Sequence, residues 1–187
     1  MNHPARKVRL GPTTGTVERR ADGVEIVRAT QPLQPYPQKL TERLEHWATV
    51  TPDRVFLAER DGPQSDCNGW RTLTYAQMWK QARRIAAALL TRKLSPDKPI
   101  AILSGNDLEH ALLSFGAMIA GIPFAPISPP YSLVSSDFGK LKYVFELLTP
   151  GLVFASCGQQ YARALREVIG DRAEIVVTRN ASAISSA

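Results

Sequence analysis

Cysteine and histidine are scarce: only two cysteines and three histidines occur among the 187 residues. Cys67 and Cys157 lie far apart, and neither has a second cysteine or histidine at metal-ligand spacing, so neither a zinc site nor a disulfide framework is expected. A reduced, cytoplasmic setting fits this pattern best. His46 and His110 are isolated in predicted helices, which favours packed or surface histidines over a catalytic base. Cys157 precedes a predicted helix, which would lower its pKa, but no partner base is in view and a structural role is favoured.

Long hydrophobic runs are also absent. The longest apolar stretch, residues 111–127, is interrupted by serine, glycine and proline and falls short of the roughly 20 residues that cross a bilayer. It predicts a buried helix followed by a buried strand, and no membrane span. Residues 1–6 carry charge without an apolar core after them, so no signal peptide is predicted and secretion is not expected.

Positive charge is in excess but is not concentrated. The formal net charge is +6, and the densest basic groups are residues 6–9, Arg19 with Arg20, and Arg83 with Arg84, with acids scattered between them. A nucleic-acid footprint needs basic residues gathered on one face, so a solvated surface is favoured and no nucleic-acid partner is expected. A basic nucleic-acid-binding domain is one of three functions considered for this chain, and the other two are given at the end of this section.

Common nucleotide and nucleophile motifs are missing as well. The sequence has neither Gly-x-Gly-x-x-Gly nor Gly-x-x-x-x-Gly-Lys, and no serine lies in a Gly-x-Ser-x-Gly elbow. No catalytic residue and no metal-binding residue is therefore assigned.

What is present is the composition of an ordinary globular chain, with 44% hydrophobic and 21% charged residues. Three regions are predicted. Residues 1–36, with four prolines and one weak strand, form an N-terminal arm. Residues 37–178 form an α/β subdomain, and residues 179–187 form a linker.

Hydrophobic periodicity and capping residues place one strand in the arm and the remaining elements in the subdomain. Strands are predicted at residues 24–27, 54–59, 70–73, 100–103, 122–127, 152–155 and 175–177, with a turn-rich loop at residues 61–69. Helices are predicted from Pro37 to Thr51, from a capping box at Thr74 and Gln77 through Leu89, from an Asn106 cap to a Gly121 cap, from Ser135 or Ser136 to Pro150, and around residues 161–168. From residue 99 strands and helices alternate, which predicts a mainly parallel sheet with helices on both faces.

Ligands of open parallel sheets gather at the carboxyl ends of the strands. Small and hydroxyl residues follow three predicted strands, at residues 104–106, 128–132 and 156–158. Helix capping is favoured for Asn106, whereas capping and ligand contact are evenly balanced for residues 128–131. Ser128, Pro130 and Tyr131 are the candidate substrate-binding residues.

Several segments resemble the adenylate-forming superfamily of acyl-CoA synthetases, luciferases and peptide-synthetase adenylation domains. These segments are residues 73–77 with the helix through 83–86, residues 100–106 with Glu109, residues 116–127, and residues 152–154. Within the superfamily, residues 128–141 and 6–12 look most like feruloyl-CoA synthases.

The resemblance implies the leading subdomain of an acid–thiol ligase. A hydroxycinnamate carboxylate would attack the α-phosphate of ATP, with Mg²⁺ offsetting the phosphate charge, and the thiol of CoA would then displace AMP. The family's phosphate loop would follow the last predicted strand, beyond Ala187, so this chain alone is expected to be inactive and to bind none of these cofactors. Residues 11–16 resemble that loop only superficially, because they lack its lysine.

Two partners follow from this interpretation: an aromatic carboxylic acid and the remainder of the ligase. The main alternative is a noncatalytic remnant that binds a partner or an aromatic acid through the exposed edge of the sheet.

Overall fold

The computed structural model describes residue 11 and residues 14–60 and 69–185. The chain forms two compact units, Met1–Gln38 and Lys39–Ala187, which are described separately. The predicted loop at residues 61–69 lies outside the described residues except for Gly69.

The first unit contains an antiparallel hairpin of β1 (Gly15–Arg19) and β2 (Glu25–Ala29). The strand expected at residues 24–27 is confirmed as β2, whereas β1 was not predicted. Gly23 adopts φ +84° in the connecting turn, where a residue without Cβ avoids a steric penalty. Val17 and Val27 face each other across the hairpin and remain exposed.

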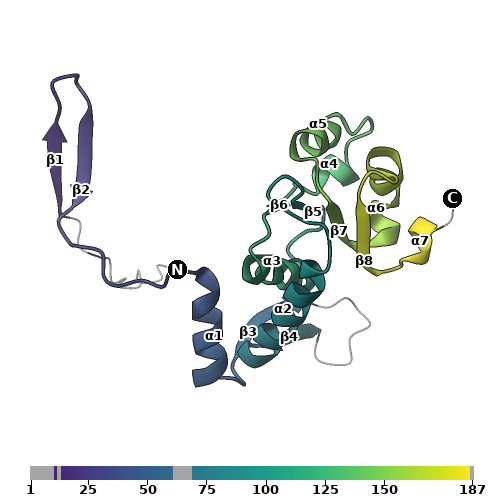
Figure 1. The fold of residues 1–187 in the computed structure, drawn as a ribbon, viewed down its shortest axis with the longest axis horizontal. Coiled ribbons are helices and arrows are strands. Elements are labelled where there is room, and N and C mark those ends of the chain that lie inside the picture. Colours follow the sequence, from purple (N-terminus) through teal and green to yellow (C-terminus); the bar gives the residue numbers. More distant parts are fainter. Residues whose placement is uncertain (1–10, 12–13, 61–68, 186–187) are drawn as a thin grey trace, which may run out of the picture. The chain divides into compact units, whose positions relative to one another are not determined.

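The second unit is built on a four-stranded parallel sheet in the order β6-β5-β7-β8 (Figure 1). Its strands are β5 (Ile100–Ile102), β6 (Phe124–Pro126), β7 (Leu152–Cys157) and β8 (Glu174–Arg179). The predicted α/β class and parallel sheet are therefore confirmed. Pro123 immediately precedes β6 and Pro126 is its last residue, and β6 is an edge strand, where a missing backbone donor is tolerated.

Both faces of the sheet are covered, because side chains alternate between them. Ile100, Ile102, Leu152 and Phe154 pack with residues of α2 (Tyr75–Leu90) and α3 (Leu108–Ala120). Their neighbours Ala101, Val153 and Ala155 pack with α5 (Gly139–Leu148), α6 (Gly158–Ala164) and a π-helical turn, η1 (Leu165–Ile169). Because both faces of the sheet are buried, its strands are apolar along their length, and this is the pattern that predicted a buried sheet.

An antiparallel pair, β3 (Val55–Arg60) and β4 (Trp70–Thr74), and the helix α1 (Leu40–Val50) pack at the outer side of α2 and α3. Met78 and Leu73 belong to the core cluster there. Thr74 and Gln77 form the predicted capping box, in which the Gln77 amide N–H donates to Thr74 Oγ1 and the Thr74 amide N–H donates to Gln77 Oε1.

The cap of α3 differs from the prediction. Asp107, not Asn106, is the N-cap residue, and its Oδ1 accepts a hydrogen bond from the His110 amide N–H at 2.8 Å. Because α3 begins at Leu108, Asn106 lies one residue too early to reach a free amide of the first turn. The predicted Gly121 cap is confirmed, with φ +71°.

The α5 region also differs from expectation. The helix begins at Gly139 rather than at Ser135 or Ser136, because Phe138 has a left-handed backbone with φ +56°. Ser135 Oγ and Asp137 Oδ1 instead accept the amide N–H groups of Phe138 and Gly139. Two short helices, α4 (Pro130–Leu133) and α7 (Ser182–Ser185), were not predicted.

Candidate functional site

The connections of the sheet reverse direction between β5 and β7. From β5 the chain crosses through α3 to β6 on one side, then returns through α5 to β7 on the other side and continues through α6 to β8. Right-handed crossovers that run in opposite directions place their helices on opposite faces of the sheet. Accordingly, α3 packs on one face, and α5 and α6 pack on the other. Ligands of such sheets bind outside the carboxyl ends of the strands at this switch point.

The backbone of Gly105, just after β5, lies at the centre of this switch point. His110 Nδ1 donates a hydrogen bond to the Gly105 carbonyl oxygen at 2.9 Å. The Tyr161 hydroxyl approaches Gly105 from the opposite face of the sheet. Its pKa is raised by burial and further by the Asp107 charge, whereas a hydrogen bond from the Gly105 backbone lowers it. His110 therefore stabilises a backbone turn through its ring, and it is half-buried; from the sequence a packed or surface histidine was favoured over a catalytic base.

Cys157 is the last residue of β7 and lies at the same edge. It is the N-cap of α6, and its thiol is partly buried. A hydrogen bond from the Gln160 amide, opposed by burial, lowers the pKa of the Cys157 thiol, and Asn180 Nδ2 donates to its Sγ at 3.5 Å. The lowered pKa agrees with the expectation from its place before a helix.

The three predicted substrate-binding residues follow β6 and lie in or before α4. Ser128 and Pro130 are exposed, and Tyr131 is half-buried, with Lys140 Nζ 5.3 Å from the centre of its ring. The helix α4 contacts α6, so the fold brings this segment to the same edge as Tyr161. No described interaction shows a ligand role for these three residues.

Tyr161, Asp107 and His110 were not predicted as members of one site. Tyr161 was placed in the apolar stripe of its helix, and it is indeed only 3% exposed. Its position in the sequence could have indicated this role, because Tyr161 lies one helical turn after the end of β7. From there a hydroxyl can reach the loop that follows the neighbouring strand β5.

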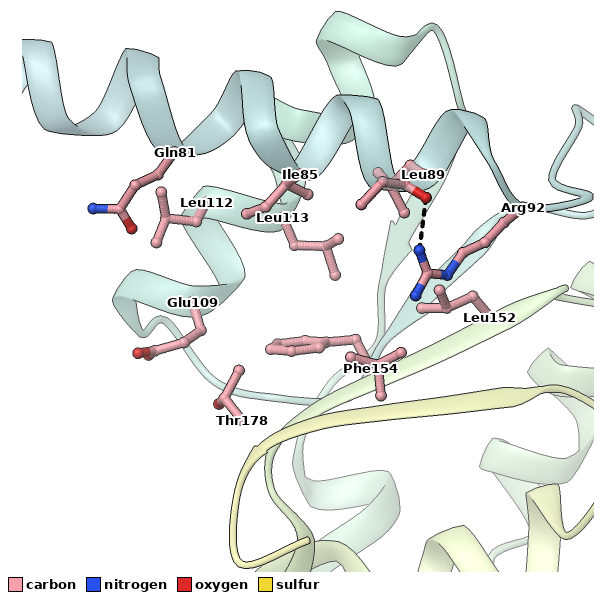
Figure 2. Close-up of a pocket in the computed structure, with 12 residues that line it drawn as sticks. Gln81, Ile85, Leu89, Arg92, Glu109, Leu112, Leu113, Leu152, Phe154 and Thr178 are labelled. Atoms are coloured by element: carbon pink, nitrogen blue, oxygen red, sulfur yellow. Dashed lines mark hydrogen bonds between the residues drawn. The ribbon is translucent and has the colours of Figure 1, made fainter.

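A second feature is an apolar groove on the face of β7 and β8 against which α2 and α3 pack, with a volume of about 380 Å³ (Figure 2). Its walls include Ile85 from α2 and Leu113 from α3, and its floor includes Phe154 and Val176. The groove was not predicted from the sequence.

Each end of the groove carries a charged residue that already has a partner. Arg92 Nε donates to Glu174 Oε2 at 2.9 Å, and Arg92 Nη1 donates to the Ala88 carbonyl. At the other end Arg71 Nη2 lies 2.7 Å from Glu109 Oε2 and 3.0 Å from Glu59 Oε2. Burial is the largest single effect and raises the pKa of Glu109. The Arg71 hydrogen bond, a backbone hydrogen bond and the charges of Arg71 and Arg179 together outweigh it and hold that pKa below its usual value.

Two kinds of feature are absent from the described residues, metal-binding clusters and membrane-spanning helices. Among residues 14–60 and 69–185, no group of three or more histidine, cysteine or acidic side chains could hold a metal ion. Nor does any helix in the described part have the length and apolarity needed to cross a membrane.

Comparison with known proteins assigns the family. The sequence model described as "AMP-binding enzyme" matches residues 44–185. A mycosubtilin synthase polypeptide from Bacillus subtilis is 31% identical over 98 residues, which cover 51% of this chain and 3% of that protein. The long-chain-fatty-acid–AMP ligase FadD32 from Mycolicibacterium smegmatis is 28% identical over 128 residues, covering 65% of this chain and 19% of that protein.

Solved structures share the fold. A fatty acyl-adenylate ligase from L. pneumophila, in complex with acyl adenylate and pyrophosphate, superposes with a TM-score of 0.61 at 19% identity, over 76% of this chain and 23% of that one. VinN superposes with a TM-score of 0.59 at 21% identity, over 76% of this chain and 32% of that one. The chain thus spans a third or less of these proteins. The resemblance to adenylate-forming enzymes is confirmed at this level, and the chain belongs to the AMP-binding enzyme family.

Proposed function

We propose that this chain is the leading part of an ATP-dependent acid–thiol ligase that resembles feruloyl-CoA synthase and acts on a hydroxycinnamate. The observation that carries the proposal is the family match over residues 44–185, which coincides with the sheet and its covering helices. The choice of a hydroxycinnamate is supported by the sequence resemblance of residues 128–141 and 6–12. ATP, Mg²⁺ and CoA belong to the whole ligase in this proposal.

The described residues do not by themselves fit these cofactors. They include no metal-binding cluster of three or more histidine, cysteine or acidic side chains, and the sequence has no glycine-rich phosphate loop with a lysine. No step of adenylation or thioester formation is therefore assigned to a residue of this chain, and the chain alone is proposed to be inactive.

The proposed part of this chain in the reaction is to hold the aromatic acid. Tyr131 offers a half-buried ring at the carboxyl edge of the sheet, and Lys140 adds positive charge 5.3 Å from the centre of that ring. An aromatic substrate ring can stack on such a side chain, and a nearby ammonium favours its carboxylate. Ser128 and Pro130 flank the same surface.

We also propose the domain organisation that the sequence predicts. Residues 1–36 act as an arm, residues 37–178 form the leading subdomain and residues 179–187 connect to further chain, in a cytoplasmic protein. Residues 182–185 of this connection form the short helix α7, which contacts α6.

The substrate is tested by thioester formation in the full ligase polypeptide that contains this chain, supplied with ATP, Mg²⁺ and CoA. Ferulate, decanoate and an amino acid are compared by mass spectrometry of the products. We expect a CoA thioester from ferulate at the highest kcat/KM. A preference for decanoate or for the amino acid would refute the hydroxycinnamate assignment and leave the family intact.

The role of Tyr131 is tested in the same assay with Tyr131→Ala, and Tyr143→Ala serves as the control because Tyr143 is 67% exposed on α5. Loss of one stacking contact is expected to lower kcat/KM for ferulate by about tenfold, which corresponds to about 1.4 kcal/mol. Equal activity of the two variants would remove Tyr131 from the substrate site.

A further inference from the structure

The helix α5 buries one side against the sheet and leaves apolar side chains on the other. Leu141 is fully buried and Phe145 is 6% exposed, and both belong to the core cluster on that face of the sheet. Tyr143 and Leu147 are 67% and 69% exposed. Because these two residues are four positions apart, they form one apolar stripe along the outer surface of α5, which lies at the periphery of the second unit (Figure 1).

The short helix α4 adds to this apolar surface. It contacts α5 and exposes two more large apolar side chains, Leu133 at 40% and Val134, its C-cap residue, at 79%. Single exposed apolar side chains are common on soluble proteins, whereas several on neighbouring elements indicate an interaction surface. We call the stripe of Tyr143 and Leu147, together with Leu133 and Val134, the α5 surface.

The charges beside the stripe are of both signs. Lys142 and Glu146 are exposed and are also four residues apart, so they lie along one flank of the stripe. Among the described residues, neither side chain forms an ion pair. A partner with charge of one sign, such as a nucleic acid or an anionic membrane, would be repelled by one of the two. The flank therefore fits a protein surface that offers one acid and one base.

A second copy of α5 offers that surface. When two identical helices pack antiparallel about a two-fold axis, each contact occurs twice, once from each copy. With Tyr143 opposite Leu147 of the other copy, the axis passes at the level of Phe145. Lys142 then lies on the same flank as Glu146 of the other copy, three residues or about 4.5 Å away along the helix axis. Two long side chains span this distance, so both charges gain a partner in each copy.

We propose that the α5 surface is the interface of a two-fold homodimer of the polypeptide that contains this chain. Tyr143 and Leu147 form its apolar centre, and two Lys142–Glu146 pairs fix the antiparallel orientation of the helices. The interface is small, because one short helix and part of α4 contribute from each copy, so the association is weak and depends on concentration. The inference goes beyond the proposed function and does not depend on which acid the ligase uses.

The oligomeric state of the full polypeptide that contains this chain tests the proposal. We expect sedimentation velocity over about 1–100 µM to show a monomer that converts to a dimer as the concentration rises. Hydrogen–deuterium exchange of α5 should slow over the same range. Tyr143 and Leu147 are not residues of the proposed substrate surface, so the dimer and the choice of substrate are tested independently.

Exchanging the two charges provides matched variants. Glu146→Lys places lysine near lysine in both halves of the interface, and Lys142→Glu places acid near acid, so each is expected to weaken dimerisation about tenfold. The double variant Lys142→Glu/Glu146→Lys restores opposite charges and should return the dissociation constant to within about twofold of the wild type. Glu45→Lys, at an exposed position of α1, makes the same change in net charge as Glu146→Lys and should leave dimerisation unchanged.

Leu147→Glu tests the apolar stripe. The new carboxylate lies opposite the ring of Tyr143 of the other copy and beside Glu146 of its own helix, so dimerisation should weaken about tenfold or more.

A full polypeptide that stays monomeric over the whole range would overturn the proposal. A monomer in which α5 exchanges as slowly as the buried strands would do so too, because another part of the same polypeptide would then cover the surface. A dimer that Leu147→Glu and Glu146→Lys leave unchanged, or a double variant that associates no better than the single variants, would also contradict the antiparallel interface.

Discussion

Cys157 shows how a single residue is altered by its place at the end of β7. Its thiolate accepts a hydrogen bond from the Gln160 amide at the start of α6, and this lowers the pKa of the thiol against the opposing effect of burial. Since the folded protein then binds fewer protons than the unfolded chain, this residue stabilises the fold at alkaline pH. That contribution is lost as the pH falls through the folded pKa.

We therefore predict that alkylation of Cys157 by iodoacetamide has its midpoint below the ordinary thiol range of about 8.5. The rates are measured against pH in a Cys67→Ser background, so that only one thiol reacts. The same protein in denaturant is the control and should show the ordinary midpoint. Identical midpoints in the folded and denatured protein would show that the helix start does not affect this thiol.

At the scale of elements, Arg71 joins the β3–β4 pair to α3. Its guanidinium contacts Glu59 on β3 and Glu109 on α3, and Glu59 Oε2 also accepts the amide N–H of Leu108 at 3.2 Å. The side chain of Arg71 is 39% exposed, so solvent screening limits the strength of each pair.

Arg71→Ala is expected to reduce the free energy of unfolding by about 1 kcal/mol near neutral pH, because two partly buried carboxylates lose their shared cation. The stabilisation by Glu109, whose pKa is lowered, is present above its unfolded pKa and is lost as the pH falls through the folded value. The variant should therefore lose less stability than the wild type on acidification. Urea titrations at several pH values measure this, with the exposed Arg43 on α1 replaced by alanine as the control.

The contact between α2 and α3 depends on a residue without a side chain. A Cβ at Gly116 would lie 2.5 Å from Ile85 Cγ2 and 3.2 Å from the Ala82 carbonyl oxygen. Ile85 is β-branched and has little freedom to move away.

Gly116→Ala is expected to destabilise the protein by about 1 kcal/mol, since overpacking of about 1–3 kcal/mol exceeds the gain in helix propensity of about 1 kcal/mol. Gly105→Ala is the matched control, because a Cβ there meets nothing within 4 Å. Thermal unfolding compares the two. A Gly116→Ala variant as stable as the wild type would mean that the helices can separate slightly without cost.

The sequence could predict those elements whose causes are local. The buried strands around Ile100 and Leu152, the capping box at Thr74 and the Gly121 cap each depend on a few adjacent residues, and all are present. The cap of α3 was misplaced by one residue because Asn106 and Asp107 have equal capping chemistry, and only the backbone turn held by Gly105 selects between them.

At the scale of the whole molecule, the features that could not be predicted depend on distant partners. The meeting of Tyr161 with Gly105 depends on strand order, which one sequence does not specify. The groove beside β8 depends on how far α2 and α3 extend over the sheet: Val176 packs against their core cluster but stays half-buried, and the sequence pattern of the strand does not show this. The strand β1 was missed because its pairing with β2, rather than its own composition, makes it a strand.

The most direct test of the central claim is ATP–pyrophosphate exchange with ferulate, measured for the 187-residue chain alone and for the full ligase polypeptide that contains it. We expect exchange above background only in the full polypeptide, because this chain has no phosphate loop with a lysine in its sequence and no metal-binding cluster among its described residues. Exchange catalysed by the isolated chain, or none in the full polypeptide with any carboxylic acid, would contradict it.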